Sequence, residues 1–307
     1  MRRKFILFTL AFSLFTQLLS AQIIQDLKAP LTFFIANDLG RNGYYQQKKI
    51  AELMGEMAET IGPECIIAAG DIHHFSGVES IYDPLWMTNY EQVYSHPELM
   101  IPWLPICGNH EYRGNTQAVL DYSKISRRWR IDEKYYTRSY EKKGTSIRLI
   151  WLDTTPLIQR YRKDPVTYPD AYKEDADKQL AWLDSTLNVA KEQWVVVIGH
   201  HPLYAQTDKP IEERTDLQKT LGEVLKKHHV DMYVCGHIHN FQHIKIQGDD
   251  IDYLVNSSAS LSRPVKSMEG TQFCSPDEGF AVLSVKKKAL ILSLINYEGK
   301  IIYQINR

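Results

Sequence analysis

Five short apolar segments of this 307-residue sequence end on side chains that can bind a metal ion. These side chains are carboxylates, imidazoles and one carboxamide, so the donor set mixes oxygen and nitrogen and contains no thiolate. Such a set suits zinc, manganese or iron, and it argues against a structural cysteine–zinc site. In chain order the donors are Asp38, Asp71, Asn109, His110, His200, His237 and His239.

This number of donors exceeds the needs of one metal ion and indicates a dinuclear site. Two ions about 3.5–4 Å apart can clamp a phosphoryl group, lower the pKa of a bound water molecule and stabilise the attacking and leaving oxygens together. Glycine precedes the donors in four of the five segments, where it lets the chain turn sharply with no side chain in the way. The pattern therefore predicts a dinuclear metal site of the kind that can clamp a phosphoryl group.

The donors must be positioned by strands, because the segments before them are short, apolar and rich in β-branched residues. These segments alternate with stretches whose apolar residues recur at helical spacing, such as Ile50, Leu53, Met54 and Met57. The resulting βαβ rhythm places the donors at the carboxyl ends of strands, where open α/β sheets bind ligands. After Gly236 the sequence reads mainly as strands and turns, as expected when a second sheet closes the fold. We predict one α/β domain of two sheets with helices outside.

Residues 1–21 have the pattern of a secretory signal peptide. Basic residues at positions 2–4 precede an apolar run that extends to Leu19 and is followed by small residues. The run is short for a spanning helix and lacks a basic flank on its far side, so a membrane anchor is the less favoured alternative. We predict a signal peptide at 1–21, a single catalytic domain at 22–307, and a secreted or periplasmic protein without a stable membrane anchor.

Charge and cysteine content exclude some functions. The formal net charge is −1, and it becomes −4 if the three basic residues leave with the signal peptide, so the basic excess of a nucleic-acid-binding protein is missing. Three of the four cysteines lie in or next to strand-like segments, where a small buried thiol is expected. Cys274 lies in a loop-like stretch, and the sequence leaves open whether it forms a disulfide.

Several blocks of the sequence, in their order, resemble the calcineurin-type metallophosphoesterases, in particular the small, tartrate-resistant purple acid phosphatases. They are Asp-x-Gly at Asp38, Gly-Asp at Asp71, Gly-Asn-His-Glu around Asn109, Gly-His at His200, and Gly-His-x-His from His237. Each block alone is a weak signal, but the ordered set is specific, and the resemblance covers most of the mature chain. It implies the metallophosphoesterase fold, a four-layer α-β-β-α sandwich of two mixed sheets.

The resemblance also implies how the donors divide between two metal ions. The ligands implied for the first ion are Asp38, Asp71, the residue at position 74 and His239. The ligands implied for the second ion are Asp71, Asn109, His200 and His237. The carboxylate of Asp71 would then bridge the two ions.

Three further residues are candidates for roles near the phosphate, and a fourth is expected to be structural. His110 corresponds to the family histidine that contacts the phosphate and assists the leaving group, so we predict that it is catalytic. His201 adjoins a ligand, and Lys209 stands where mammalian relatives have a substrate-side histidine, so both are candidate substrate-binding residues. Asp153 ends a strand, and we expect it to have a structural hydrogen-bonding role.

Position 74 departs from the family pattern. Purple acid phosphatases have a tyrosine there, whose phenolate binds ferric iron and gives the colour, whereas this chain has His74. Because an imidazole can still bind a metal, we predict that His74 is a ligand. Successive side chains of an extended segment point to opposite sides, so His73 should point away from the metal and have a supporting role. Two divalent ions against Asp38 and Asp71 leave the same formal charge surplus as a ferric–divalent pair against two aspartates and a phenolate. We therefore expect two divalent ions, with Fe, Zn and Mn as candidates.

The predicted function is that of an exported phosphatase acting on a small phosphorylated substrate. We expect it to hydrolyse a phosphomonoester by attack of a metal-bound hydroxide, with His110 assisting the departing alcohol. A phosphodiesterase or nucleotide hydrolase using the same site, and a catalytically silent phosphoryl-binding module, are alternatives. Redox chemistry at iron is a further hypothesis, which the replacement of tyrosine by His74 disfavours. The sequence determines neither the natural substrate nor the oligomeric state.

Overall fold

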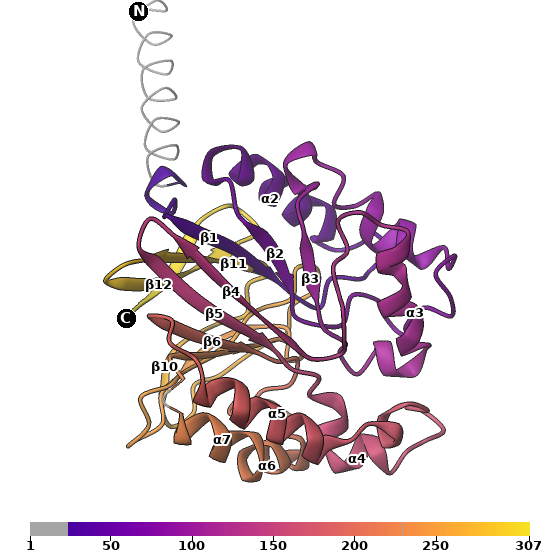
Figure 1. The fold of residues 1–307 in the computed structure, drawn as a ribbon. Helices are drawn as coiled ribbons and strands as arrows, with labels where there is room; N and C mark the ends of the chain where they lie inside the picture. The colour runs from indigo at the N-terminus through magenta and orange to yellow at the C-terminus, as the bar shows by residue number, and fades with distance from the viewer. Residues whose placement is uncertain (1–23, 229) are drawn as a thin grey trace, which may run out of the picture.

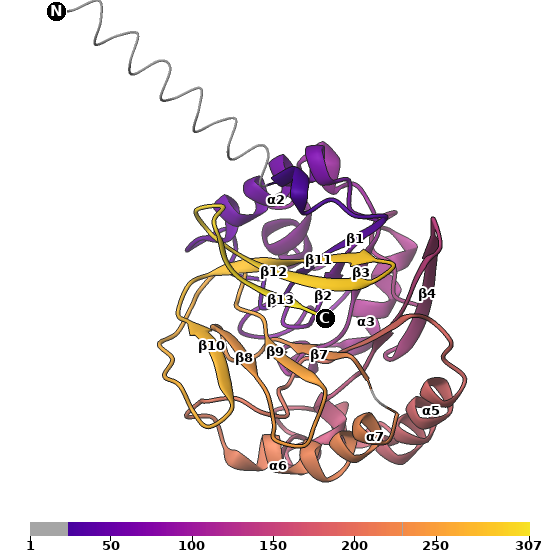
Figure 2. The same ribbon diagram turned by 90° about the vertical axis from the view of Figure 1, so that its left-hand side faces the viewer.

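The computed structural model describes residues 24–228 and 230–307. The predicted signal peptide at 1–21 lies outside the described residues. Two β-sheets pack face to face, with helix α2 over the outer face of one sheet and helices α5 to α7 over the other (Figures 1 and 2). Of the helices in the described part of the chain, none is long and apolar enough to cross a membrane.

The first sheet has six strands in the order β13-β12-β11-β1-β2-β3. The strands β1, β2 and β3 are parallel to one another, whereas β11, β12 and β13 continue the sheet as antiparallel neighbours on the other side of β1. Their bounds are β1 (Leu31–Ala36), β2 (Cys65–Ala68), β3 (Trp103–Pro105), β11 (Gly279–Lys286), β12 (Ala289–Asn296) and β13 (Ile301–Asn306).

The second sheet has seven strands in the order β10-β8-β9-β7-β6-β5-β4. Its centre, from β5 through β6 and β7 to β9, is parallel, and the flanking strands are antiparallel. The bounds are β4 (Tyr136–Lys142), β5 (Thr145–Trp151), β6 (Trp194–Ile198), β7 (Met232–Cys235), β8 (Phe241–Ile244), β9 (Asp252–Val255) and β10 (Thr271–Ser275).

The helices form where apolar residues recur at helical spacing beside end signals. In α2 the apolar side chains Ile50, Met54, Met57 and Ile61 are buried, and the helix ends at Gly62, whose φ of 63° is the left-handed cap that glycine favours. The remaining α-helices are α3 (Thr116–Asp121), α4 (Gln159–Arg162), α5 (Ala176–Asn188), α6 (Ile211–Lys219) and α7 (Leu221–Lys227), and α2 spans Gln47–Ile61.

The predicted fold class is confirmed, because both sheets are mixed and helices lie outside them. The carboxy-terminal strands differ from the expectation: they do not build one closing sheet, since β8 to β10 extend the second sheet while β11 to β13 extend the first. Leu217, Leu221 and Leu225 recur at helical spacing, yet they belong to two helices, α6 and α7, which are divided at Thr220. The strand β4 and the short helices α3 and α4 were not predicted.

A buried carboxylate joins the loops that follow β2 and β3. Glu111 is fully buried, and its Oε2 accepts hydrogen bonds from the backbone N–H groups of Asp71 at 2.9 Å and Gly108 at 2.7 Å. Its Oε1 accepts a third bond, from the N–H of His73 at 3.0 Å. Hydrogen bonds to a charged acceptor are about twice as strong as neutral ones, so this carboxylate fixes one loop relative to the other.

A second buried carboxylate lies where β5 ends. The hydroxyl of Tyr112 donates to Oδ2 of Asp153 at 2.5 Å, and the backbone of Asp153 exchanges two hydrogen bonds with the side chain of Gln179 on α5. Burial raises the pKa of Asp153 to about 7, although the charge of Lys134 opposes the shift. These contacts agree with the structural role expected for Asp153.

Replacing Glu111 with Gln should destabilise the fold. The amide cannot accept at its nitrogen, so the N–H of His73 loses its acceptor, and the two remaining bonds lose their charge. We expect the free energy of unfolding to fall by about 2–4 kcal/mol, measured by urea denaturation. Glu52→Gln, at an exposed position of α2, should change it little. Equal stabilities of Glu111→Gln and the wild type would contradict the proposed link between the loops.

Replacing Asp153 with Asn should weaken the pH dependence of stability. Because the pKa of Asp153 is raised in the folded state, its contribution is fully present below the unfolded value near 4 and is lost as the pH rises to about 7. This loss amounts to at most about 4 kcal/mol, and an Asn side chain cannot ionise.

The test is urea denaturation of wild type and Asp153→Asn across this pH range. The variant should gain stability relative to the wild type as the pH rises, whereas Asp250→Asn, at an exposed position, should follow the wild type. Parallel curves for the wild type and Asp153→Asn would show that Asp153 does not titrate in this range.

Candidate functional site

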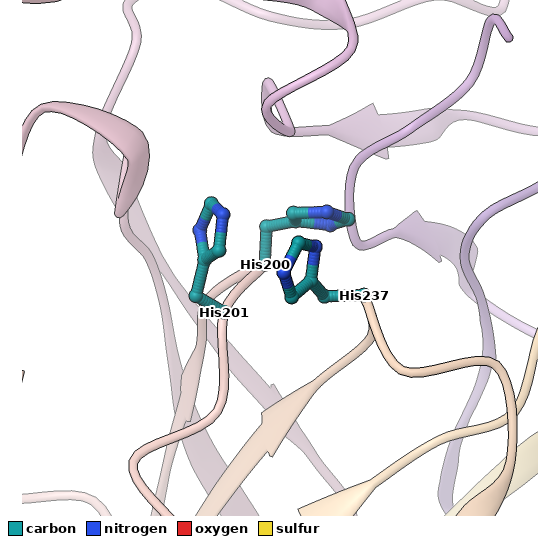
Figure 3. A group of neighbouring side chains, drawn as sticks. All are labelled: His200, His201 and His237. Atoms are coloured by element: carbon teal, nitrogen blue, oxygen red, sulfur yellow. The ribbon is translucent and has the colours of Figure 1, made fainter. Parts of the chain in front are cut away.

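The structure gathers the donors that the sequence singled out at the carboxyl ends of parallel strands from both sheets. Asp38, Asp71 and Asn109 follow β1, β2 and β3 of the first sheet, and His200 and His237 follow β6 and β7 of the second. Figure 3 shows the rings of His200, His201 and His237 close together, where the loops after β6 and β7 meet. Four groups have donor atoms within 4.8 Å of one another: Asp38, His74 and His239; Asp38, Asp71 and His200; Asp71, His74 and His110; and His200, His201 and His237.

Several of these buried donor atoms have no hydrogen-bond partner among the described residues. They are Oδ1 of Asp38, Nε2 of His74, Oδ1 of Asn109, Nε2 of His200 and Nδ1 of His237. Leaving a polar atom buried and unpaired costs about 1–3 kcal/mol, so a cluster of such atoms needs an explanation. A bound cation supplies one, because every atom of the set can offer it a lone pair.

Backbone carbonyls fix the tautomer of three histidines. The Nδ1 atoms of His200, His74 and His239 lie 2.9, 3.1 and 2.8 Å from backbone carbonyl oxygens. A carbonyl oxygen can only accept a hydrogen bond, so each Nδ1 carries the proton and each Nε2 keeps its lone pair. This is the arrangement by which metal-binding histidines are oriented in proteins.

A buried glutamate fixes the ring of His237 in the opposite tautomer. Oε2 of Glu213 lies 3.0 Å from Nε2 of His237, so Nε2 carries the proton and the lone pair lies on Nδ1. Glu213 belongs to α6 and also accepts from Tyr161 and Arg160. Sequence analysis did not identify Glu213, because a single acidic residue in a charged helix carries no signal of burial.

The carboxylate of Asp38 is held by one oxygen and free at the other. Asn37 donates to its Oδ2 at 2.6 Å, and the backbone N–H of His237 donates to the same atom at 2.9 Å. Oδ1 has no hydrogen bond and lies 3.2 Å from Nε2 of His239. Asn37 thus orients the carboxylate of its neighbour.

Asp71 lies at the centre of the cluster. Its Oδ2 is 3.1 Å from Nε2 of His200, 3.5 Å from Nε2 of His74 and 3.8 Å from Nε2 of His110. A Cβ atom at Gly108 would lie 2.2 Å from Oδ1 of Asp71, so only glycine fits there. This central position is the one that a bridging ligand requires.

The charges of the cluster match a cation. Burial alone would raise the pKa of Asp38 and Asp71, but the neighbouring histidines hold both below the ordinary value, His239 for Asp38 and chiefly His200 for Asp71. Burial would lower the pKa of His200, yet the charge of Asp71 raises it to about 9. The negative charge of Asp71 therefore attracts both a proton on His200 and a metal ion, so the two compete.

The backbone of the cluster is strained. Four of its non-glycine residues, Asp38, Asp71, His237 and His239, have φ between 52° and 71°. This left-handed region costs side-chain-bearing residues of order 1–3 kcal/mol each, and such strain collects at functional sites. The conformation turns the side chains of residues that directly follow strands toward one another.

His110 lies at the mouth of the cluster. Its Nδ1 is 2.6 Å from the carbonyl oxygen of Phe75, which fixes the proton on Nδ1 and directs Nε2 toward Asp71. Burial lowers the pKa of His110 to about 4 against the opposing charge of Asp71. The side chain is 12% exposed, so it can meet a ligand that enters from solvent.

Two histidines lie behind the donor atoms. His201 is fully buried, and its ring nitrogens lie 2.9 Å from Oγ1 of Thr154 and 3.1 Å from the hydroxyl of Tyr161. Both nitrogens are thus engaged within the protein, and the substrate-binding role of His201 stays a prediction. His73 is also buried and packs edge-on against Trp86, with 4.6 Å between the ring centroids.

A cleft of about 430 Å³ lies beside the cluster and includes Lys209, Arg263 and the residues that flank His239. Lys209 is half-buried, as expected for a residue that contacts a bound molecule. Larger grooves of about 690 and 590 Å³ lie elsewhere and include none of the candidate ligands. The lining of the cleft of about 430 Å³ contains no candidate metal ligand either, but it includes Lys209 and both chain neighbours of His239.

Comparison with known proteins gives relatives with named activities. Purple acid phosphatase 4 of Arabidopsis thaliana is 29% identical, and the match covers 96% of this chain and 88% of that protein. Tartrate-resistant acid phosphatase type 5 of Oryctolagus cuniculus is also 29% identical, over 83% of this chain and 82% of that protein. Purple acid phosphatase 3 of Arabidopsis thaliana, 29% identical as well, is longer, and the match covers 75% of this chain and 63% of that protein.

A solved structure supports the fold. The protein described as GAP50, the anchor in the inner membrane complex of Plasmodium, superposes with a TM-score of 0.76 over 90% of this chain and 87% of its own, at 24% identity. The relatives confirm the predicted resemblance and the expectation of a metal-dependent phosphoric ester hydrolase. The family model described as calcineurin-like phosphoesterase matches residues 31–241, more than half of the sequence, and the chain therefore belongs to the calcineurin-like phosphoesterase family.

Proposed function

We propose that this chain hydrolyses phosphomonoesters with two metal ions held by the cluster. The observation that carries the proposal is the set of five buried donor atoms without hydrogen-bond partners among the described residues, each on a residue expected to be a ligand. The purple and tartrate-resistant acid phosphatases among its relatives support the same activity. We also propose that residues 1–21 are a signal peptide and that 22–307 form the exported catalytic domain.

The donor set fits two metal ions of the zinc, manganese or iron type. In the proposed assignment, Asp71 bridges the ions. The other ligands of the first ion are Asp38, His74 and His239, and those of the second are Asn109, His200 and His237. When bound, such a pair supplies a strong electrostatic attraction for the phosphoryl oxygens and makes a water molecule more acidic.

The chain itself orients the phosphate and handles the leaving group. His110 directs Nε2 into the mouth of the cluster, where it can bond to the phosphoryl or leaving-group oxygen. Its protonated form can donate a proton to the departing alkoxide, and the fixed Nδ1 proton keeps the ring in place for that transfer. Lys209, at the cleft, carries a charge that attracts the anionic substrate.

The first test is phosphate release by purified protein loaded with zinc or manganese, with p-nitrophenyl phosphate as a monoester and bis(p-nitrophenyl) phosphate as a diester. We expect the larger kcat/KM for the monoester. Asp71→Ala should lower it by at least about a hundredfold and reduce bound metal, because one carboxylate serves both ions. Asp184→Ala, a partly exposed aspartate, should behave like the wild type.

Three outcomes of this test would change the proposal. Faster turnover of the diester would make the chain a phosphodiesterase. Binding of phosphate by metal-loaded protein without any hydrolysis would make it a phosphoryl-binding module. Full activity of Asp71→Ala would show that the reaction occurs elsewhere.

Position 74 offers an optical test of the ligand assignment. Nε2 of His74 is buried without a hydrogen-bond partner, so a ring placed there reaches the candidate first-ion site. We expect His74→Tyr, loaded with iron and oxidised in air, to gain the visible absorption band of a phenolate bound to ferric iron. The wild type treated in the same way should lack the band, because imidazole is not a phenolate donor. His228→Tyr is the matched control, and a purple wild type would refute the assignment.

A further inference from the structure

Three cations surround the proposed metal site without an ion pair. They are Arg41, Lys209 and Arg263, and none has a carboxylate oxygen within 4.0 Å among the described residues. From this arrangement we propose that the site has a second anion-binding position and that the preferred substrates carry a second phosphate on the leaving group. The inference rests on the proposed phosphomonoesterase function and specifies its substrate class.

Arg41 is the strongest evidence, because it is buried without a partner. Its exposed fraction is 8%, and its Nε is a buried donor with no hydrogen bond among the described residues. The guanidinium lies over the ring of Phe75, 5.1 Å from the centroid, and the carbonyl of Phe75 holds His110. A donor atom that is buried without a hydrogen-bond partner beside the proposed catalytic histidine is costly, and an anion bound there would supply the missing acceptor.

Lys209 and Arg263 bring two more charges to the same region. Both line the cleft of about 430 Å³, and the backbone N–H of Arg263 donates to the carbonyl of the candidate ligand His239 at 2.7 Å. Burial lowers the pKa of Arg41 and of Lys209, and the positive charge of Arg263 lowers both further, so Arg263 lies within electrostatic range of each of the other two. The carboxylates of Asp38 and Asp71 raise the same two values, which places this group beside the candidate metal site.

The formal charges leave room for a second phosphate. Two divalent ions against Asp38 and Asp71 leave a surplus of two positive charges, which one phosphomonoester dianion neutralises. The three cations then remain, and Asp208 is the carboxylate that lines the cleft with Lys209 and Arg263. About two positive charges remain. A second phosphate, which carries about −1.5 to −2 at neutral pH, would neutralise them. Arginine is well suited to such a group, because its planar fork bonds to two phosphate oxygens.

The test compares substrates that differ by one phosphate. We expect kcat/KM for fructose 1,6-bisphosphate to exceed that for fructose 6-phosphate by about tenfold, the effect of one charge-assisted contact. Arg263→Gln and Arg41→Gln should lower the value for the bisphosphate about tenfold more than that for the monophosphate. The two phosphates of inorganic pyrophosphate are adjacent. If Arg263→Gln and Arg41→Gln also lower kcat/KM for pyrophosphate, the second position lies next to the metal site. If they lower it only for the bisphosphate, the position lies farther along the cleft. Arg130→Gln removes an exposed charge elsewhere and should leave every ratio unchanged.

A binding measurement separates this inference from the proposed activity. By calorimetry, wild-type protein should bind propane-1,3-diphosphonate about tenfold more tightly than propylphosphonate, and Arg263→Gln should lose the difference. Equal losses on mono- and bisphosphates would place the cations on the reacting phosphate and overturn the inference. If p-nitrophenyl phosphate is hydrolysed but neither diphosphonates nor bisphosphates are preferred, the inference alone fails. If no phosphate ester is hydrolysed, the proposed function fails first.

Discussion

The candidate site depends on one buried carboxylate, that of Glu111. Three backbone N–H groups, from Asp71, His73 and Gly108, donate to its two oxygens, so the loops after β2 and β3 share a single charged acceptor. The backbone N–H of His110 also donates to Oδ1 of Asp71 at 2.9 Å, which joins the same two loops. Because Asp71 stands at the centre of the donor cluster and Asn109 follows Gly108, the geometry of the site is set by the three bonds to Glu111 as much as by the sheets.

A similar division of labour recurs around the cluster. Four donor residues have one polar atom that hydrogen-bonds within the protein and another with no partner among the described residues; they are Asp38, His74, His200 and His237. The hydrogen-bonded atom fixes the orientation of the side chain, and the other atom remains available to a metal ion. The left-handed backbone of Asp38 and His237 adds to the cost of the arrangement. A fold selected only for stability would have no reason to keep both the strain and the unpaired atoms.

The sequence was sufficient for the fold class and for the membership of the donor cluster. Strand ends carry their own signal, because an apolar run that stops at a glycine and a metal-binding side chain is readable without any tertiary information, as at Asp71 and His200. Residues that act through another residue were not found. Glu213 and Asn37 look like ordinary polar residues, and only the packing of α6 and the loop after β7 shows what they orient. The partners of His201 were not found for the same reason, since Thr154 and Tyr161 are distant from it in sequence.

The donors are divided between the two sheets, and this has a consequence for folding. In the proposed assignment each ion takes ligands from both, for example Asp38 after β1 and His239 after β7 for the first. Each ion would then link the loops of one sheet to the loops of the other, instead of binding to a surface that is already held together without it. A ligand that binds only the folded chain adds its binding free energy to stability, so metal supply would influence how long the protein survives proteolysis as well as how fast it works.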